Sequence, residues 1–480
     1  MEGVKIGLEV HIQLNTESKI FCSCPVGNPD EPNTNVCDTC LGFPGTKPQL
    51  NEKAIELAIK IAIALGSNIN RRFLFSRKTY FYPDLAKNFQ ITQQEIKVAT
   101  GGSVDLKGKN IRLRGVHLEE DPARIVRKDD YCLLDYNRSG TPLVEIVTEP
   151  DISSPLEARI FLQKLQQILE YLYVTDFEKE GCMRMDANIS IVKYGGAYDK
   201  TKGGFIREKT TGNRVEIKNI SGIKEVEKSL NYEILRQKNI QAVKRETRLW
   251  NEKTKTTVSA RAKEEEEDYG YIFEPDLPVI ELAEGFIKKI SDHMPELPDT
   301  KKKRYMKLGN VSEELIDTIL TEPEMANYFE YLCETHNEKA SAVILAKYLR
   351  KTLNYHNLKL RDTGIEVRQL RRIIDLLQEH HINDDVAELI LREMVYDSVN
   401  EKKVRDPEHI LRDMKYEKPI ENERLERLVK DVIRDNAKAV RDYEDGKDES
   451  FNYLLGQVMK KTGRQAHADR IREILKGILD

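Results

Sequence analysis

Hydrophobic and polar residues alternate along the first stretch of the chain, from Val4 to Leu14. The apolar row is Ile6, Leu8, Val10, Ile12 and Leu14, and the polar row is Lys5, Gly7, Glu9, His11 and Gln13. Side chains of a β-strand point alternately to its two faces, so this period of two predicts a strand with one core face and one open face. Further strands are expected at 111–120, 143–149, 183–191 and 214–219, the last two with the same alternation.

Helical periodicity is clearest at 51–65, where Asn51 can cap the helix and Gly66 can end it. Ser154-Pro155-Leu156-Glu157 reads as a capping box that opens a second helix running to about Tyr173. From about Asp299 onward proline nearly vanishes and helical periodicity takes over, which predicts a domain boundary near 285–295. The helices expected after it span 324–336, 340–353, 366–379, 384–397, 423–434, 436–442 and 466–479.

Composition narrows the class of protein. The chain has 480 residues, 39% hydrophobic and 33% charged, with a net charge of -4, and this length predicts two to four domains. No apolar stretch approaches the roughly 20 residues of a membrane span, and the start lacks the pattern of a signal peptide. We therefore expect a cytoplasmic protein with no membrane contact. Its negative charge argues against indiscriminate coating of nucleic acid, so RNA binding should be regional.

One region near the C-terminus is basic. Between Gly456 and Lys476 the bases Lys460, Lys461, Arg464, Arg470, Arg472 and Lys476 stand against the acids Asp469 and Glu473. Such a patch can contact RNA phosphates, although a solvated helix pair would have the same composition.

Four of the seven cysteines form two close pairs, Cys22 with Cys24 and Cys37 with Cys40, on either side of a turn-rich loop. In a cytosolic chain this spacing favours a metal site over disulfides. Four thiolates suit a closed, structural zinc site, although only one residue separates the first pair. The alternative is four ordinary buried thiols.

The open faces of the predicted strands are rich in groups that bind metal or phosphate. Glu9 and His11 point the same way from the first strand, and acids follow at Glu119, Glu120, Asp121 and Glu145. Later strands add Arg184 with Asp186 and Glu216 with Lys218. The aromatic segment 79–90 lies among Lys78 and Lys87, as for an anionic ligand with a flat ring, or as in a packed surface loop. The plain alternative for the strands is a solvated polar face without function.

Taken together, these stretches resemble the B subunits of aspartyl/glutamyl-tRNA amidotransferases nearly from end to end. The motifs that carry the resemblance are IGLEVH at 6–11, YFYPD at 80–84, HLEED at 117–121, NRSGTPLVEIVTEPD at 137–151, MRMDANIS at 183–190, EIKN at 216–219, FEPDL at 273–277 and LLGQVMK at 454–460. The archaeal subunit of the glutamine-only enzyme shares the first half, but residues 285–480 leave no room for its extra synthetase-like domain.

The resemblance implies an α+β protein. Its cradle domain, 1–290, would have a fold similar to glutamine synthetase and guanidino kinases. An all-α domain, 291–405, and a small helical, tRNA-binding tail, 406–480, would follow.

The implied activity is ATP-dependent phosphorylation of the side-chain carboxylate of Glu-tRNA(Gln) or Asp-tRNA(Asn), followed by amidation with ammonia. The implied cofactors are Mg²⁺ or Mn²⁺ beside ATP, and a structural Zn²⁺. The implied partners are two further proteins in a heterotrimer. One is an amidase-type glutaminase, the A subunit, which makes ammonia from glutamine, and the other is the small C subunit.

Carried over by motif, the metal ligands would be Glu9, His11, Glu120, Glu145 and Asp186, with Glu119 as an additional candidate. Basic residues Lys78 and Arg184 would act in catalysis. Lys87, Glu216 and Lys218 would serve the phosphates or the ammonia route.

Two other functions fit the same residues. One is a small-molecule phosphagen-type kinase or amide ligase on the same fold, and the other is a non-catalytic, zinc-containing scaffold that binds tRNA. A phosphate loop is excluded, because five residues separate Gly102 from Gly108 and Asn110 stands where Ser or Thr is needed. The chain also lacks the Ser-Ser-Lys signature of amidases, so a partner must supply the ammonia.

Overall fold

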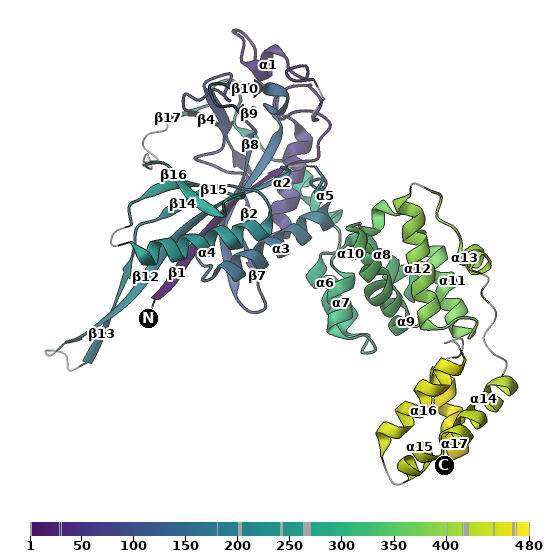
Figure 1. Cartoon of the computed structure of the whole chain (residues 1–480). Helices are drawn as coiled ribbons and strands as arrows, with labels where there is room; N and C mark the ends of the chain where they lie inside the picture. The colour runs from purple at the N-terminus through teal and green to yellow at the C-terminus, as the bar shows by residue number, and fades with distance from the viewer. Residues whose placement is uncertain are drawn as a thin grey trace. The chain divides into compact units, whose positions relative to one another are not determined.

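The computed structural model describes residues 2–27, 29, 31–179, 181–199, 204–240, 243–262, 270–400, 402–414, 416, 422–444, 447–462, 466 and 468–479. Contacts within the chain divide it into two compact units, Met1–Leu297 and Pro298–Asp480. The first unit is built around sheets and the second is helical, so the protein is of mixed α+β class (Figure 1). Within this described part, no helix is both long enough and apolar enough to cross a bilayer.

A large, mostly antiparallel sheet forms the centre of the first unit, with strand order β16-β15-β14-β12-β1-β11-β8-β6-β2. β13 pairs with β12, β7 pairs with β8, and only β14 and β15 run parallel to each other in the pairings described. Its strands are β1 (Glu2–Gln13), β2 (Asn68–Ile69), β6 (Ala99–Thr100), β7 (Ser103–Asp105), β8 (Asn110–Glu120), β11 (Pro142–Thr148), β12 (Met183–Asp199), β13 (Gly204–Thr211), β14 (Val215–Ile220), β15 (Glu246–Asn251) and β16 (Thr256–Ala262).

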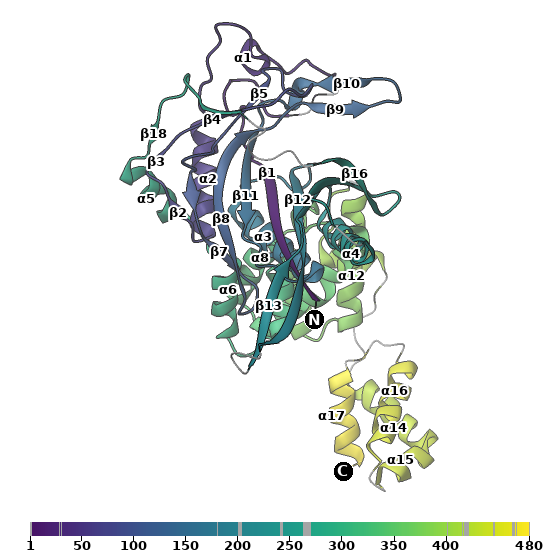
Figure 2. The same ribbon diagram turned by 90° about the vertical axis from the view of Figure 1, so that its left-hand side faces the viewer.

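Smaller sheets complete the strands of this unit. Their members are β3 (Arg72–Phe73), β4 (Ser76–Thr79), β5 (Phe89–Thr92), β9 (Arg124–Arg127), β10 (Cys132–Asp135), β17 (Gly270–Phe273) and β18 (Ile280–Glu281). β17, β4 and β5 form one sheet, β18 pairs with β3, and β9 pairs with β10. The β9–β10 hairpin extends away from the large sheet in Figure 2.

Strand β1 lies at the middle of the large sheet because it pairs with β12 on one side and β11 on the other. Its apolar row is buried, with Ile6, Val10 and Ile12 each 0% exposed. The expected alternation of this strand is therefore confirmed, and its polar row is left for the opposite face.

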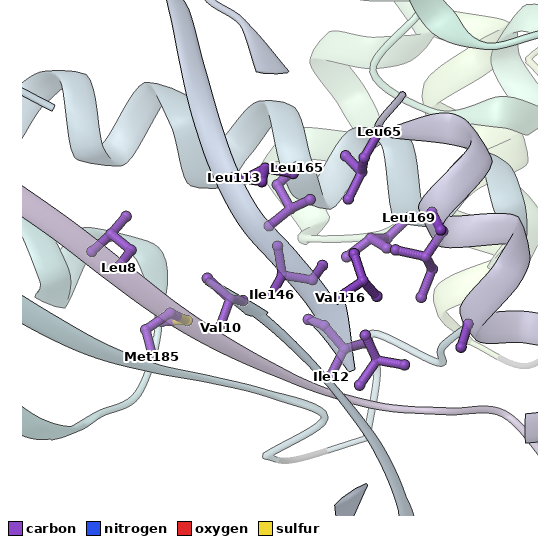
Figure 3. Packing of buried hydrophobic residues seen from close by; sticks show 14 of the residues in the cluster. Leu8, Val10, Ile12, Leu65, Leu113, Val116, Ile146, Leu165, Leu169 and Met185 are labelled. Atoms are coloured by element: carbon purple, nitrogen blue, oxygen red, sulfur yellow. The ribbon is translucent and has the colours of Figure 1, made fainter. Parts of the chain in front are cut away.

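Helices cover the apolar face of the large sheet. α2 (Glu52–Ala64) and α3 (Pro155–Leu172) place Leu65, Leu165 and Leu169 against side chains of β1, β8 and β11, as Figure 3 shows. α4 (Ile223–Asn239) and α5 (Glu284–Asp292) add Leu230 and Ile290 to the same core. The first unit extends to Leu297 because α5 packs on α2. The short α1 (Asp38–Leu41) and the 3₁₀ turn η1 (Tyr136–Arg138) lie in loops.

Two predicted helix starts are confirmed, one with a difference. The Asn51 side chain accepts hydrogen bonds from the amides of Lys53 and Ala54, as a cap should. Ser154 caps α3 by accepting from the amide of Glu157, but the Glu157 carboxylate accepts from Ser153 and not from the capping residue. The capping box predicted there is thus only half formed, because Lys109 and Ser153 also bind that carboxylate.

The second unit consists of helices from Pro298 onward. They are α6 (Pro298–Met306), α7 (Glu313–Ile319), α8 (Pro323–Cys333), α9 (Glu338–Ala342), the π-helical η3 (Val343–Leu349), α10 (Arg350–His356), the 3₁₀ turn η4 (Leu360–Asp362), α11 (Val367–Gln378), α12 (Asp384–Val399), α13 (Pro407–Asp413), α14 (Asn422–Asp435), α15 (Ala437–Glu444), α16 (Asp448–Lys461) and α17 (Ala468–Leu479). The sequence pattern did not predict α6, α7, α13 and α16. The last four helices share an apolar cluster that includes Val429, Leu454, Val458 and Ile471. A division of this unit at 405/406 stays a prediction.

Candidate active site

The polar row of β1 meets polar residues of its neighbours through the strand register. Glu9 lies opposite Asp186 of β12, and His11 lies opposite Glu145 of β11. Glu145 in turn lies opposite His117 of β8. Since directly opposed residues of antiparallel strands point to the same face, side chains far apart in sequence gather on one face of the sheet.

The first group of possible ligands is His11, Glu119 and Glu145, whose ligand atoms all lie within 4.8 Å of one another. His11 Nδ1 is 2.9 Å from Glu119 Oε1. Burial alone would lower the pKa of His11, but its hydrogen bond to Glu119 and the charge of Glu145 raise that pKa to about 9. A divalent cation would displace the proton, because an imidazole binds metal in its neutral form.

His117 supports this group from the neighbouring strand. Its Nε2 is 2.8 Å from Glu145 Oε2, and the side chains are 8% and 14% exposed. Burial would raise the pKa of Glu145, but the positive charges of His117 and His11 lower it below its usual range. Glu145 is therefore held as a carboxylate, which is the form that binds a cation.

The second group is Glu9, Asp186 and Glu216, again with ligand atoms within 4.8 Å of one another. Lys218 Nζ lies 3.5 Å from Asp186 and 3.6 Å from Glu216. Burial raises the pKa of Glu9, and the charges of Glu145, Asp186 and Glu216 raise it further. Such mutual repulsion is relieved when a cation binds.

Both groups fit a hard divalent cation by donor chemistry and spacing. Carboxylate oxygens suit Mg²⁺, and Mn²⁺ also accepts an imidazole. Two ligands of one Mg²⁺ at about 2.1 Å lie at most about 4.2 Å apart, so only a small contraction of either group is needed. Glu9 and His11 are two residues apart on one strand, which separates the groups by about 7 Å.

Two predicted basic residues lie beside these groups in different settings. Lys78 comes from β4, and burial would lower its pKa, but the charges of Tyr271, Glu119 and Glu145 raise it, so it stays an ammonium. Arg184 donates to Asp121 Oδ1 at 2.6 Å. Asp121 is 0% exposed and also accepts from Gln13 at 3.0 Å, so this end of the face is a structural ion-pair network.

Glu120 and Lys87 lie elsewhere. Lys87 Nζ binds both Glu120 oxygens at 2.6 and 2.7 Å, and Glu120 also accepts from the amide of Ile91. The cause is the alternation of β8: His117 lies opposite Glu145, so Glu119 shares that face and Glu120 points to the other one. The irregularity of β8, where Arg114 is an extra residue, lies before this regular stretch.

The four cysteines converge on one point, with sulfur atoms within 4.8 Å of one another. Tetrahedral zinc with bonds of about 2.3 Å separates its sulfur ligands by about 3.8 Å, so the cluster fits that ion. A hydrogen bond from Cys22 lowers the pKa of Cys40 to about 5, and the Lys19 ammonium, 3.9 Å from the Cys40 sulfur, lowers it as well. The cluster could bind a structural zinc.

The cysteine loop also touches the Lys87–Glu120 pair. Gly42 ends α1 in the left-handed region, with φ 71°, and any side chain there would collide with Lys87. Lys87, Glu120, Cys22 and Cys40 line one cavity of about 210 Å³. The cysteine loop therefore packs against the buried Lys87–Glu120 ion pair.

Three groups that complete the site were not among the predicted site residues. His117 was visible, since it precedes Glu119 by two residues and so shares its face. Asn188, whose amide donates to Glu9 Oε1 at 2.9 Å, was visible by the same spacing from Asp186. Thr247, which donates to Glu216 at 3.1 Å, had no local signal because its strand joins the sheet from a distant part of the chain.

Known proteins resemble this chain along nearly its whole length. The family described as GatB/GatE catalytic domain matches residues 4–288, and the one described as GatB domain matches residues 327–479. The B subunit of the aspartyl/glutamyl-tRNA(Asn/Gln) amidotransferase of Methanospirillum hungatei is 41% identical, over 99% of this chain and 98% of that protein. Its namesakes from Natronomonas pharaonis and Carboxydothermus hydrogenoformans are 38% and 36% identical, over 99% and 98% of this chain and 97% of each relative.

Zinc should copurify with the chain at about one equivalent, as expected for a closed four-thiolate site. Cys24→Ser should remove most of it and lower the free energy of unfolding by about 4 kcal/mol where free zinc is a thousandfold above its Kd. Metal analysis and chemical denaturation measure both. Cys333→Ser, a cysteine of similar exposure outside the cluster, is the control, and metal-free native protein would refute the zinc site.

The two neighbouring acids of β8 should behave differently. Glu119→Gln removes a ligand and should weaken Mn²⁺ binding about tenfold or more, as seen by calorimetry. Glu120→Gln should weaken Mn²⁺ binding much less, because Glu120 acts on that group only through Glu119, but it should cost about 3 kcal/mol of stability, because the buried Lys87 loses its carboxylate. The reverse pattern would restore Glu120 as the ligand and contradict the grouping of side chains described above.

Proposed function

The chain belongs to the family of aspartyl/glutamyl-tRNA(Asn/Gln) amidotransferase B subunits, and on that premise we propose that its sheet transfers a phosphoryl group from ATP to a carboxylate. The carboxylate is the side chain of glutamate on tRNA(Gln) or of aspartate on tRNA(Asn). Members of this family are subunits of glutamine-hydrolysing amidotransferases. The observation that carries the proposal is the pair of ligand groups, one begun by Glu9 and one by His11, side by side on an open sheet face.

The reaction joins two anions, so the site must reduce the repulsion between them. A carboxylate oxygen forms a bond to the γ-phosphorus of ATP while the bond from that phosphorus to the bridging oxygen breaks, and ADP leaves. Divalent cations would neutralise charge on the phosphates. Six side chains in two groups would hold two such ions, His11, Glu119 and Glu145 the first and Glu9, Asp186 and Glu216 the second.

Side chains that carry positive charge then place the two reactants. Lys78 reaches the first group from a separate sheet, and Lys218 stands between Asp186 and Glu216 in the second. In this role Lys78 attracts the transferred phosphoryl group and Lys218 keeps the second group compact. Arg184 acts at a distance by fixing Asp121, and Lys87 supports the end of β8 through Glu120.

Amidation follows from the product of the first step. Ammonia attacks the carbonyl carbon of the acyl phosphate, and phosphate leaves. Because water would attack the same carbon, ammonia should arrive through protein from a partner that hydrolyses glutamine. We expect an amidase-type A subunit and a small C subunit in a heterotrimer, since the relatives are named as B subunits, which implies a complex of several subunits.

Three further parts of the proposal rest on the family. The large sheet would be akin to the catalytic sheets of glutamine synthetase and the guanidino kinases, the zinc would hold a loop and take no part in chemistry, and the complex would act in the cytoplasm.

The helical tail would bind the tRNA. Lys460, Arg472 and Lys476 are exposed on α16 and α17, which contact each other, whereas Arg464 lies outside the described residues.

Asp186→Asn tests the phosphoryl transfer. The substitution keeps size and removes one charge from the second group, so ADP formation that depends on misacylated tRNA should fall by about a hundredfold or more, which is the scale for loss of one transition-state contact. The readouts are ADP and amidated aminoacyl-tRNA made by the reconstituted complex. Asp151→Asn, whose carboxylate pairs with Arg112, is the matched control. Unchanged amidation by Asp186→Asn would favour a non-catalytic scaffold.

Neutralising Lys460, Arg472 and Lys476 to Gln together tests the tail. Affinity for tRNA should fall, and the slope of log K against log salt should become shallower by about one per lost contact. ADP binding should not change. Lys288, Lys289 and Lys303, which are also exposed, give the control triple. Unaltered tRNA affinity in the tail triple would place the RNA surface elsewhere, whereas an unsubstituted complex that binds no tRNA would favour a small-molecule kinase.

A further inference from the structure

The loop between β4 and β5 presents aromatic side chains to solvent. Phe81 is 83% exposed and Tyr82 is 41% exposed. Burial of a phenylalanine ring stabilises a fold, and Phe81 forgoes most of that stabilisation. Single exposed apolar residues are common on protein surfaces, so exposure by itself indicates nothing. The groups around this loop decide what Phe81 can do.

The loop is held in place on both sides of Phe81. On one side, Thr79 ends β4 and pairs with Phe89 of β5. On the other side, three hydrogen bonds tie the loop to the β9–β10 hairpin and to its two ends. They run from Arg127 Nη2 to Tyr82 Oη at 2.6 Å, from Tyr136 Oη to the Pro83 carbonyl at 2.7 Å and from the Ala123 amide to the Asp84 carbonyl at 3.0 Å. The exposed ring of Phe81 therefore projects from a fixed backbone.

Lys78 connects this loop to the first ligand group. Its ammonium interacts with the charges of Glu119 and Glu145, and its Nζ lies 5.9 Å from the centroid of the Tyr80 ring. Three residues of chain span at most about 11 Å, so the backbone of Phe81 lies within that distance of the backbone of Lys78. The side chains that lead from Lys78 to the surface are named the aromatic strip here, and they are Tyr80, Phe81, Tyr82 and Arg127.

The aromatic strip has the composition with which proteins bind unpaired nucleotides. Bases of single-stranded RNA stack on aromatic rings and on the planes of guanidinium groups. A surface that binds the phosphate backbone needs a cluster of cations instead. Here Arg127 is the cation of the strip, and the acids Asp129 and Asp130 follow Lys128 in the turn of the hairpin. The strip therefore favours bases over phosphates.

The substrate of the proposed reaction has unpaired nucleotides close to its reacting carboxylate. That carboxylate belongs to an amino acid esterified to the 3′-terminal ribose of a tRNA, and this end of the RNA is single-stranded. When the carboxylate lies beside Lys78, the nucleotides that carry it must leave the site over the neighbouring surface. Stacked nucleotides rise by about 3.4 Å each, so the last few of them cover the span from Lys78 to Phe81.

We propose that the aromatic strip binds the unpaired 3′ nucleotides of the aminoacyl-tRNA. One base stacks on the ring of Phe81, and the guanidinium of Arg127, which Tyr82 holds, offers its plane to a second base. This assignment rests on the proposed phosphoryl transfer and adds the path by which its substrate enters. Because every base has a π-face, such stacking supplies affinity without selecting a sequence.

Phe81→Ala tests the strip in the reconstituted complex, and the exposure of Phe81 means that its loss should not disturb folding. The Kd of unacylated tRNA should rise about tenfold, the scale for loss of one stack between a base and an aromatic ring. The same tRNA without its unpaired 3′ nucleotides should bind the variant and the unsubstituted complex equally, and so should ADP. Filter binding measures the RNAs and calorimetry measures ADP. Tyr355→Ala in α10, at 85% exposed, is the control and should leave the ratio of the two RNA affinities unchanged.

Two further substitutions of Phe81 separate stacking from plain apolar contact. Phe81→Leu keeps apolar bulk but has no ring, so it should bind intact tRNA as weakly as Phe81→Ala does. Phe81→Trp offers a larger π-face and should bind at least as tightly as the unsubstituted complex. Arg127→Gln should also weaken intact tRNA more than the shortened RNA.

Several results would overturn the assignment. They are unchanged affinity of Phe81→Ala for intact tRNA, equal weakening of intact and shortened tRNA, and full affinity of Phe81→Leu. Loss of another subunit from the Phe81→Ala complex would assign the ring to a protein interface, and weaker ADP binding would assign it to the phosphoryl donor. The phosphoryl transfer fails separately, if the unsubstituted complex binds intact tRNA more tightly than shortened tRNA but forms no ADP with misacylated tRNA.

Discussion

Strand β1 holds like charges together on one face by what it buries on the other. Ile6, Val10 and Ile12 are each 0% exposed, and burying such a side chain contributes about 1.5–3 kcal/mol. On the open face, two carboxylates about 5 Å apart repel each other by about 3 kcal/mol at an effective dielectric of 20. Because the register with β11 and β12 is set by the core, the acids cannot separate, and a cation is the group that relieves them.

Strand alternation carried most of what could be predicted about this site. Glu9 and His11 were visible from the period of β1, and Asp186 from that of β12, because a buried apolar row fixes the opposite row without knowledge of the fold. Glu119 could be separated from Glu120 in the same way from the nearest apolar row, because Val116 and Leu118 are buried and Glu119 belongs to the opposite row. Counted from Ile111 the alternation gives the other answer, because Arg114 is an extra residue, and a bulge is set by pairing between distant strands, which a single sequence does not contain.

The helices also differ in whether neighbouring residues or residues far along the chain carry the signal that predicts them. Asn51 and Ser154 marked the starts of α2 and α3 because a cap acts on its own first turn. α6 has few buried residues and a weak apolar stripe, and its Lys301 is buried against Glu330 of α8. A lysine that packs in a core through a distant ion pair looks like a surface residue in the sequence, so such a helix escapes periodicity.

The cysteine loop is connected to the first ligand group through a series of contacts. Gly42 packs against Lys87, and the Lys87 ammonium forms an ion pair with Glu120. The next residue, Asp121, accepts hydrogen bonds from Arg184 and Gln13. Glu119, the residue before Glu120, points to the other face and meets His11. Because Glu119 and Glu120 are neighbours on one strand, the contacts that fix the position of Glu120 on one face also restrict the position of Glu119 on the other face. A structural zinc in that loop would therefore stabilise the geometry of the first ligand group without touching it.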